Sequence, residues 1–274
     1  MEEDWGDIFR SIQNFVSPEQ EIAEEIRDIG ADNEDYVNRM LGRENRIAIA
    51  GLTSCLPSRI MHHGWLLQVR NTAIDSIVTI GGPFGVRQIT IYAAVTYVDR
   101  FLSVMPIKNE RFRIPVLLGM ACLNLASEVL ERYEHQVDLS EYEKFADYDE
   151  TTIMDMTDHV IHQFGETVTC VTPIQFTKYF LSRFCRDNTR TEYARIKTVH
   201  VIMSTLGDVR LMSLRPFIVG LAATLLASNP NILNEGQIAT EIAALPPNWL
   251  IPLDEVCSCY NRLLETNRER LDIS

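Results

Sequence analysis

The apolar residues of this chain recur at the spacing of an α-helix. Residues 57–73 form the clearest amphipathic segment, because one face of the predicted helix collects apolar side chains and the opposite face collects polar ones. The inward residues are Ile60, Met61, Trp65, Leu66 and Val69, and the outward residues are Arg59, Gln68 and Arg70. Residues 86–105 are apolar on almost every face, which is typical of a helix enclosed by others. Strand signals are nearly absent, so the pattern predicts an all-α fold.

Prolines and glycines divide the rest of the chain into further helices. A Gly-Gly-Pro break at residues 81–83 ends the first segment. Near the start, Ser17 can cap a helix, Pro18 suits its first turn and Gln20 completes a capping box, so a leading helix is expected there. Shorter helices are expected at residues 139–145, 151–164, 173–185, 191–207, 234–244 and 252–266.

An internal repeat organises these helices into two units. Residues 115–127, "PVLLGMACLNLAS", and residues 216–228, "PFIVGLAATLLAS", are identical at six of thirteen positions. Both segments start with proline and are apolar all round, so each is expected to be the central helix of a bundle. The alternative is a chance match between two helices rich in alanine and leucine. Duplication predicts two tandem five-helix bundles, at residues 51–165 and 166–274, after a helical extension at residues 1–50.

Composition and charge narrow the class of protein. The chain has 274 residues, of which 46% are apolar, and this is ample for two cores. The net charge of −13 argues against nucleic-acid binding, since contacts to phosphates need clustered cations. It favours basic protein partners, although solubility alone would also account for it. The acidic start is no secretory signal, and the longest apolar stretch, residues 216–227, is too short to span a bilayer.

Sites for catalysis, metals or cofactors are not indicated. The six cysteines show neither CxxC nor metal-ligand spacing, and they predict a reduced intracellular compartment. The paired histidines at 62–63 and at 159 and 162 have no third ligand at fixed spacing. Asp99 and Arg100 are expected to serve as structural partners between helices. With no nucleophile elbow and no phosphate-binding or dinucleotide-binding glycine loop, we expect a protein that is not an enzyme and holds no cofactor.

Residues 89–127 contain "YVDRFLS", a short linker and "LLGMACLNLAS", and this pairing resembles the core of the cyclin box of D-type and A-type cyclins. Residues 59–69 are similar to the first helix of that box, and residues 171–184 to the opening of a second cyclin fold. The resemblance covers roughly residues 55 to 230. It implies two five-helix units and a protein that docks on a cyclin-dependent kinase, whose catalytic helix it repositions.

The resemblance also implies where the kinase is held. Cyclins grip it with a Lys after the "LAS" motif and with a Glu in the fifth helix. By register, these positions are Glu128 and Thr157, so both gripping residues are replaced. Arg132, one turn after Glu128, is expected to supply the cation, and Asp158 the carboxylate if the register slips by one. The alternative is that these are ordinary solvated charges.

A second implied site is the family's docking patch for short Arg-x-Leu peptides of substrates or adaptors. It lies on the first box helix and is expected at Ser58, Arg59, His62, Trp65 and Leu66. Arg59 and Trp65 match the family pattern, but Ser58 and His62 replace the apolar Met and Leu. We therefore expect weak docking.

Two functions remain open on the sequence alone. The first is a divergent cyclin that binds and activates a cyclin-dependent kinase in cell-cycle or meiotic control, in the nucleus or cytoplasm. The second is a cyclin-fold adaptor that recruits proteins without activating a kinase. The missing Lys and Glu favour the adaptor, whereas the well-kept core does not discriminate, because core positions report packing.

Overall fold

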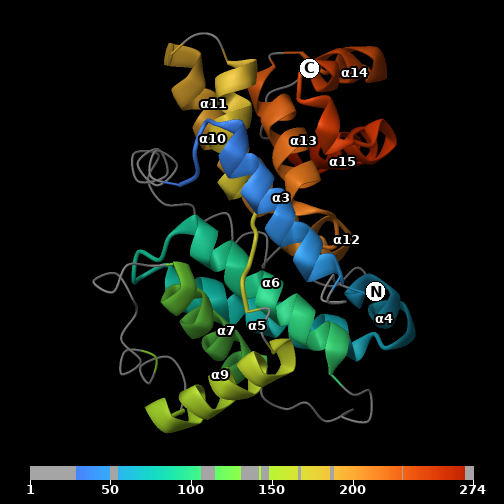
Figure 1. The fold of residues 1–274 in the computed structure, drawn as a ribbon. Helices are drawn as coiled ribbons and strands as arrows, with labels where there is room; N and C mark the ends of the chain where they lie inside the picture. The colour runs from blue at the N-terminus through green and yellow to red at the C-terminus, as the bar shows by residue number, and fades with distance from the viewer. Residues whose placement is uncertain are drawn as a thin grey trace. The chain divides into compact units, whose positions relative to one another are not determined.

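The computed structural model describes residues 29–49, 55–105, 115–130, 142, 148–165, 168–185, 188–229 and 231–268. Throughout these residues the regular structure is helical and no strand occurs, so the all-α prediction is confirmed (Figure 1). None of the helices described is both long enough and apolar enough to cross a bilayer. The chain separates into two compact units, and α3 (Glu34–Ile49) passes from one to the other after Gly42.

The first unit comprises the described residues within 43–171 and 206–213. Its described helices are α4 (Leu56–His62), α5 (Trp65–Gly81), α6 (Gln88–Val104), α7 (Pro115–Leu130), α9 (Glu150–Phe164) and the short α12 (Val209–Met212). α7 packs against α5, α6 and α9, and every residue of α7 from Leu117 to Ser127 is buried. α7 is therefore the central helix of this unit.

The second unit repeats this plan around α13 (Pro216–Ser228). Its other described helices are α10 (Ile174–Phe184), α11 (Asn188–Met203), α14 (Glu235–Ala243) and α15 (Leu253–Asn267). α13 packs against α10, α11 and α15, and all its residues from Phe217 to Ala227 are buried. Both repeated segments are thus buried central helices, as their sequence predicts. The duplication itself stays a prediction.

The prediction of a single helix over residues 57–73, with its inward and outward sides, was wrong in two respects. The chain forms two helices there, because α4 ends at His62 and α5 starts at Trp65, with Gly64 between them. The orientation of two side chains was also wrong. Met61 is 85% exposed, whereas Arg70 is fully buried. The leading helix expected near Ser17 and the helix expected at residues 139–145 lie outside the described residues, apart from Ile29 and Tyr142.

Arg70 is buried because it forms an ion pair with Asp99 of α6. Arg70 Nε lies 2.7 Å from Asp99 Oδ1, and a terminal nitrogen of Arg70 lies 3.1 Å from Asp99 Oδ2. Burial raises the pKa of the Asp99 carboxyl, and the Arg70 guanidinium opposes that shift. Arg100, the next residue, donates to the carbonyl of Thr169 at 3.1 Å. Asp99 and Arg100 therefore both make structural contacts, but each has its own partner and they do not form a pair with one another.

Glycine is required where α7 crosses α5. A Cβ atom placed on Gly119 would lie 2.0 Å from Ser76 Oγ and 2.5 Å from the Ala73 carbonyl oxygen. In the second unit, a Cβ on Gly220 would lie 2.8 Å from the Pro173 carbonyl oxygen. Because backbone atoms cannot give way as side chains do, each central helix depends on the absence of one methyl group.

Gly119→Ala should lower the free energy of unfolding by about 1–3 kcal/mol, because it overpacks the contact between α5 and α7. Chemical denaturation measures the loss. Gly42→Ala is the matched control, since nothing lies within 4 Å of a Cβ placed there on α3. That control should leave stability equal or raise it by up to about 1 kcal/mol. Equal effects of both substitutions would contradict the close approach.

Arg70→Met should cost about 3–5 kcal/mol of unfolding free energy, because it leaves the Asp99 carboxylate buried without a partner. The double variant Arg70→Met/Asp99→Leu removes both charges and should recover much of that loss. Thermal and urea unfolding of the two variants give the comparison. A double variant no more stable than Arg70→Met would show that the pair is not what holds these side chains in the core.

Candidate protein-interaction site

α9 presents one apolar and one polar face. It begins after Asp149, whose side chain accepts a hydrogen bond from the Thr152 backbone N–H at 2.8 Å and so caps the helix. The face toward the unit's core consists of Ile153, Met156, Thr157, Val160 and Phe164. The opposite face is exposed, and it includes Met154, Asp155 and Asp158.

Of the two candidate residues on α9, only Asp158 is at the surface. Thr157 is 4% exposed, and its hydroxyl donates to the Ile153 carbonyl at 2.9 Å. Asp158 follows it on the exposed side of the helix. A carboxylate that is to meet a partner can therefore come from Asp158, whereas Thr157 packs within the unit.

Glu128 is exposed on the last turn of α7, where it accepts a hydrogen bond from Asn124 Nδ2 at 2.9 Å. A carboxylate is unfavourable at this end of a helix, because the macrodipole is negative there. A cation nevertheless binds the same end of α7. Arg87, the residue before α6, donates from a terminal nitrogen to the Leu130 carbonyl at the same helix end. Arg132, the predicted source of the cation, lies outside the described residues.

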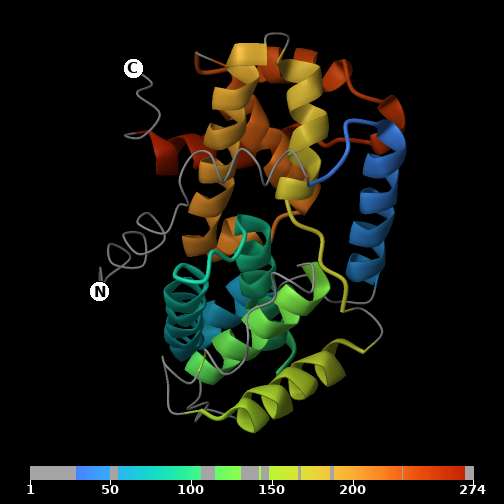
Figure 2. The same cartoon turned by 90° about the vertical axis from the view of Figure 1, so that its left-hand side faces the viewer.

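Two exposed apolar side chains accompany these charges, and sequence reasoning missed both. Val129 on α7 is 43% exposed, and Met154 on α9 is 50% exposed. The two helices pack directly on one another (Figures 1 and 2). We refer to these exposed residues of the two helices, Glu128 and Val129 on α7 and Met154 and Asp158 on α9, as the α7–α9 face. Met154 could have been found from the sequence, since it stands one turn before Asp158.

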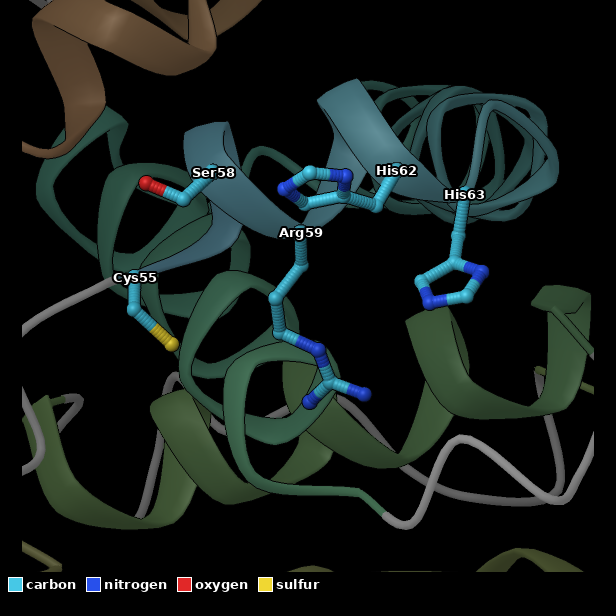
Figure 3. A pocket seen from close by; sticks show the side chains of 5 residues that line it. All are labelled: Cys55, Ser58, Arg59, His62 and His63. Atoms are coloured by element: carbon cyan, nitrogen blue, oxygen red, sulfur yellow. The ribbon is translucent and has the colours of Figure 1, made fainter.

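The second candidate site surrounds a hollow of about 310 Å³ beside α4. Its lining residues are Cys55, Ser58, Arg59, His62 and His63 (Figure 3). The Arg59 side chain extends away from Ser58 and His62 toward the end of α6, where its terminal nitrogens donate to the carbonyls of Ser103 and, at 2.7 Å, Met105. A cation at a helix C-terminus satisfies carbonyls that have no partner within the helix. Arg59 is therefore committed to α6 rather than offered to a ligand.

The remaining residues of the predicted docking patch divide between surface and core. Ser58 and His62 are exposed, Trp65 is half-buried and Leu66 is fully buried. Leu66 thus packs inside the unit and contributes no contact surface. Met61, which the sequence pattern placed inward, instead adds an exposed apolar side chain to α4.

Metal binding finds no support in the described part of the chain, where no three His, Cys, Asp or Glu side chains are arranged to hold an ion. Burial raises the pKa of the thiols of Cys122 and Cys170, and it raises the pKa of Cys259 to about 12. These thiols stay protonated near neutral pH, which suits packing and not reactivity.

Comparison with known proteins finds similarity to cyclins both in a family model and in individual relatives. Residues 54–167 match the model of the cyclin N-terminal domain. The chain is similar to Cyclin-D3-1 of Oryza sativa subsp. japonica, with 26% identity over 95% of this chain and 75% of the relative. It is also similar to Cyclin-D5-1 of Arabidopsis thaliana, with 27% identity over 87% and 74%. For Cyclin-D3-2 of Arabidopsis thaliana the identity is 24% over 86% and 62%, so the match leaves out more than a third of that relative.

Proposed function

The chain belongs to the cyclin family, and on that premise we propose that it is a regulatory subunit that binds and activates a cyclin-dependent protein kinase. The chemistry would then belong to the kinase, in cell-cycle or meiotic control within the nucleus or cytoplasm. For the domains we propose an extension at residues 1–50, a first cyclin box at 51–165 and a second cyclin fold at 166–274.

The observation that carries the proposal is the α7–α9 face. Val129 and Met154 are large apolar side chains that stay exposed on two helices in direct contact. Protein interfaces commonly have such an apolar centre with a polar rim, and Glu128 and Asp158 stand beside these residues in sequence and along the helix. These side chains therefore offer apolar and acidic contacts to a protein partner.

The charges of this face make the kinase grip different from that of other cyclins. We propose that Asp158 supplies the carboxylate that accepts from backbone amides of the kinase. The family's lysine position is held by Glu128, which cannot donate a hydrogen bond to a carbonyl. A cation must replace it, and we propose Arg132, one turn after Glu128 in the sequence. Arg87 is already bound to the Leu130 carbonyl at the end of α7.

Asp158→Lys should reduce the affinity for the kinase at least tenfold, because truncating one partner of a buried charged contact costs about 2–5 kcal/mol and a reversal costs more. Asp254→Lys on α15 is the control, since it reverses another exposed carboxylate, in the second unit. Co-purification of cyclin-dependent kinases with each full-length variant gives the readout. Equal binding by Asp158→Lys and the control would remove the α7–α9 face from the proposal.

The adaptor remains the second candidate, and Glu128 is the observation that favours it. A kinase assay on the co-purified complex separates the two functions. Phosphorylation of a peptide substrate that depends on the added chain supports activation. A complex with the kinase inactive, or no complex unless Glu128→Lys is introduced, supports the adaptor.

We also propose that α4 docks Arg-x-Leu peptides, and only weakly. The exposed Met61 and half-buried Trp65 offer apolar contact, but Ser58 and His62 interrupt it. Restoring apolar residues with Ser58→Met/His62→Leu should tighten peptide binding about tenfold or more, because burying each such side chain is worth about 1.5–3 kcal/mol. Calorimetric titration measures the change. An unchanged affinity would show that these peptides do not bind at α4.

A further inference from the structure

Leu250, in the second unit, combines two features that cost stability. It follows the short 3₁₀-helix η3 (Pro247–Trp249), and its side chain is 84% exposed. Its backbone is left-handed, with φ 46° and ψ 58°, which crowds the Cβ atom against a backbone carbonyl oxygen. The three other residues with positive φ in the described part of the chain, Gly30, Gly85 and Gly165, are all glycines. The turn itself would therefore be better served by glycine or asparagine than by leucine.

The residue before Leu250 anchors the turn to the core of the second unit. The buried Trp249 ring has its centre 5.3 Å from that of Tyr179 and 5.6 Å from that of Phe217. Its Nε1 donates to Asn38 Oδ1 at 2.8 Å, and Asn38 belongs to the same unit. Prolines precede and follow the turn, and their rings restrict φ on both sides of it. Leu250 is therefore held in a fixed position at the surface.

The chain around Leu250 is uncharged and largely apolar. Residues 242–253 contain no charged side chain, although 23% of the whole chain is charged. Several apolar side chains of this stretch are exposed or half-buried, and we refer to Pro247, Leu250, Ile251, Pro252 and Leu253 as the Leu250 surface. Apolar residues scattered singly over a surface are common, but four of these five are consecutive. A rigid cluster of this kind is typical of an interaction surface.

The charges that follow the Leu250 surface in the chain are negative. Asp254 and Glu255 lie in the first turn of α15, and both are exposed. They also stabilise that helix, because the macrodipole is positive at its start. On α3 a cation follows Asn38, but Arg39 lies over the ring of Tyr36, 5.8 Å from its centre. An apolar surface with a negative border is complementary to a partner that is both apolar and basic.

We propose that the Leu250 surface docks a basic amphipathic helix of a protein partner, with apolar side chains around Leu250 and lysines or arginines beside Asp254 and Glu255. A protruding leucine fits between four side chains of a helix, as a knob fits into a hole in a coiled coil. The net charge of −13 attracts a basic segment, and the same carboxylates repel anionic lipid headgroups. The surface belongs to the second unit and the α7–α9 face to the first, so this inference goes beyond the proposed kinase-binding function.

The test uses the full-length chain and a labelled helical peptide with leucines along one face and lysines beside them. Fluorescence anisotropy should show saturable binding that weakens as salt is raised. Leu250→Asn should weaken this binding at least fivefold, because it removes the protruding apolar side chain. The same substitution should leave the melting temperature unchanged or raise it by up to about 4 °C, since asparagine adopts the left-handed conformation more readily. A lower melting temperature would show that Leu250 serves the fold, and it would overturn the proposal.

Two matched controls separate this surface from the rest of the second unit. Ile232→Asn makes the same kind of change at another exposed apolar side chain, outside the Leu250 surface, and should change affinity less than twofold. Asp254→Asn/Glu255→Gln should weaken peptide binding at least fivefold and reduce its dependence on salt. Asp32→Asn/Glu265→Gln removes two other exposed carboxylates of the unit and should change affinity less than twofold.

Four results would contradict the proposal. The first is a loss of affinity in the control variants as large as in the variants of the Leu250 surface. The second is equally tight binding of a peptide with glutamates in place of the lysines. The third is capture of the wild type, but not of Leu250→Asn, by phosphatidylcholine vesicles, because the surface would then meet a membrane. The fourth is a dimer in sedimentation experiments that Leu250→Asn dissociates, because the occupant would then be a second copy of this chain.

Discussion

The ion pair between Arg70 and Asp99 is the constraint on which the first unit depends. Two charges are tolerated in a dry interior only as a well-formed pair, since either one alone carries a large desolvation cost. The contact is bidentate, so it fixes the rotation of α5 against α6 as well as their separation. α7 then packs on both helices and carries one half of the α7–α9 face.

Other arginines of this unit bind backbone carbonyls. Arg59 binds the last carbonyls of α6, Arg87 binds the last carbonyl of α7, and Arg100 binds a carbonyl in the segment after α9. Arg59 and Arg87 satisfy backbone acceptors that the helices leave open, and Arg100 satisfies one in a non-helical segment. Because these cations face backbone carbonyls, they offset little of the negative charge on the surface of the unit.

Much of the fold could be predicted from the sequence, because it depends on apolar periodicity. The central helices at 115–127 and 216–228 are apolar all round, and that pattern has few other solutions. Arg70 could not be placed in this way. Rules of amphipathicity put an arginine on the solvent face, and its partner Asp99 is twenty-nine residues away in the chain. The exposure of the predicted site residues on α9 was hard to foresee for a related reason. A shift of one residue moves a side chain by about 100° around a helix of about 3.6 residues per turn, which separates the buried Thr157 from the exposed Asp158.

The close contact at Gly119 has a consequence for recognition. Because Gly119 has no side chain, α7 lies directly against Ser76 and the Ala73 carbonyl of α5, and Ser76 donates to Ala73 in the same contact. A helix held in this way has little freedom to shift or fray when a partner arrives. The entropy of ordering α7 is lost when the protein folds, not when it binds, so a weak set of surface contacts can still give useful affinity. The absence of a side chain at Gly119 would thus lower the entropy cost of binding, so that fewer surface contacts are needed for the same affinity.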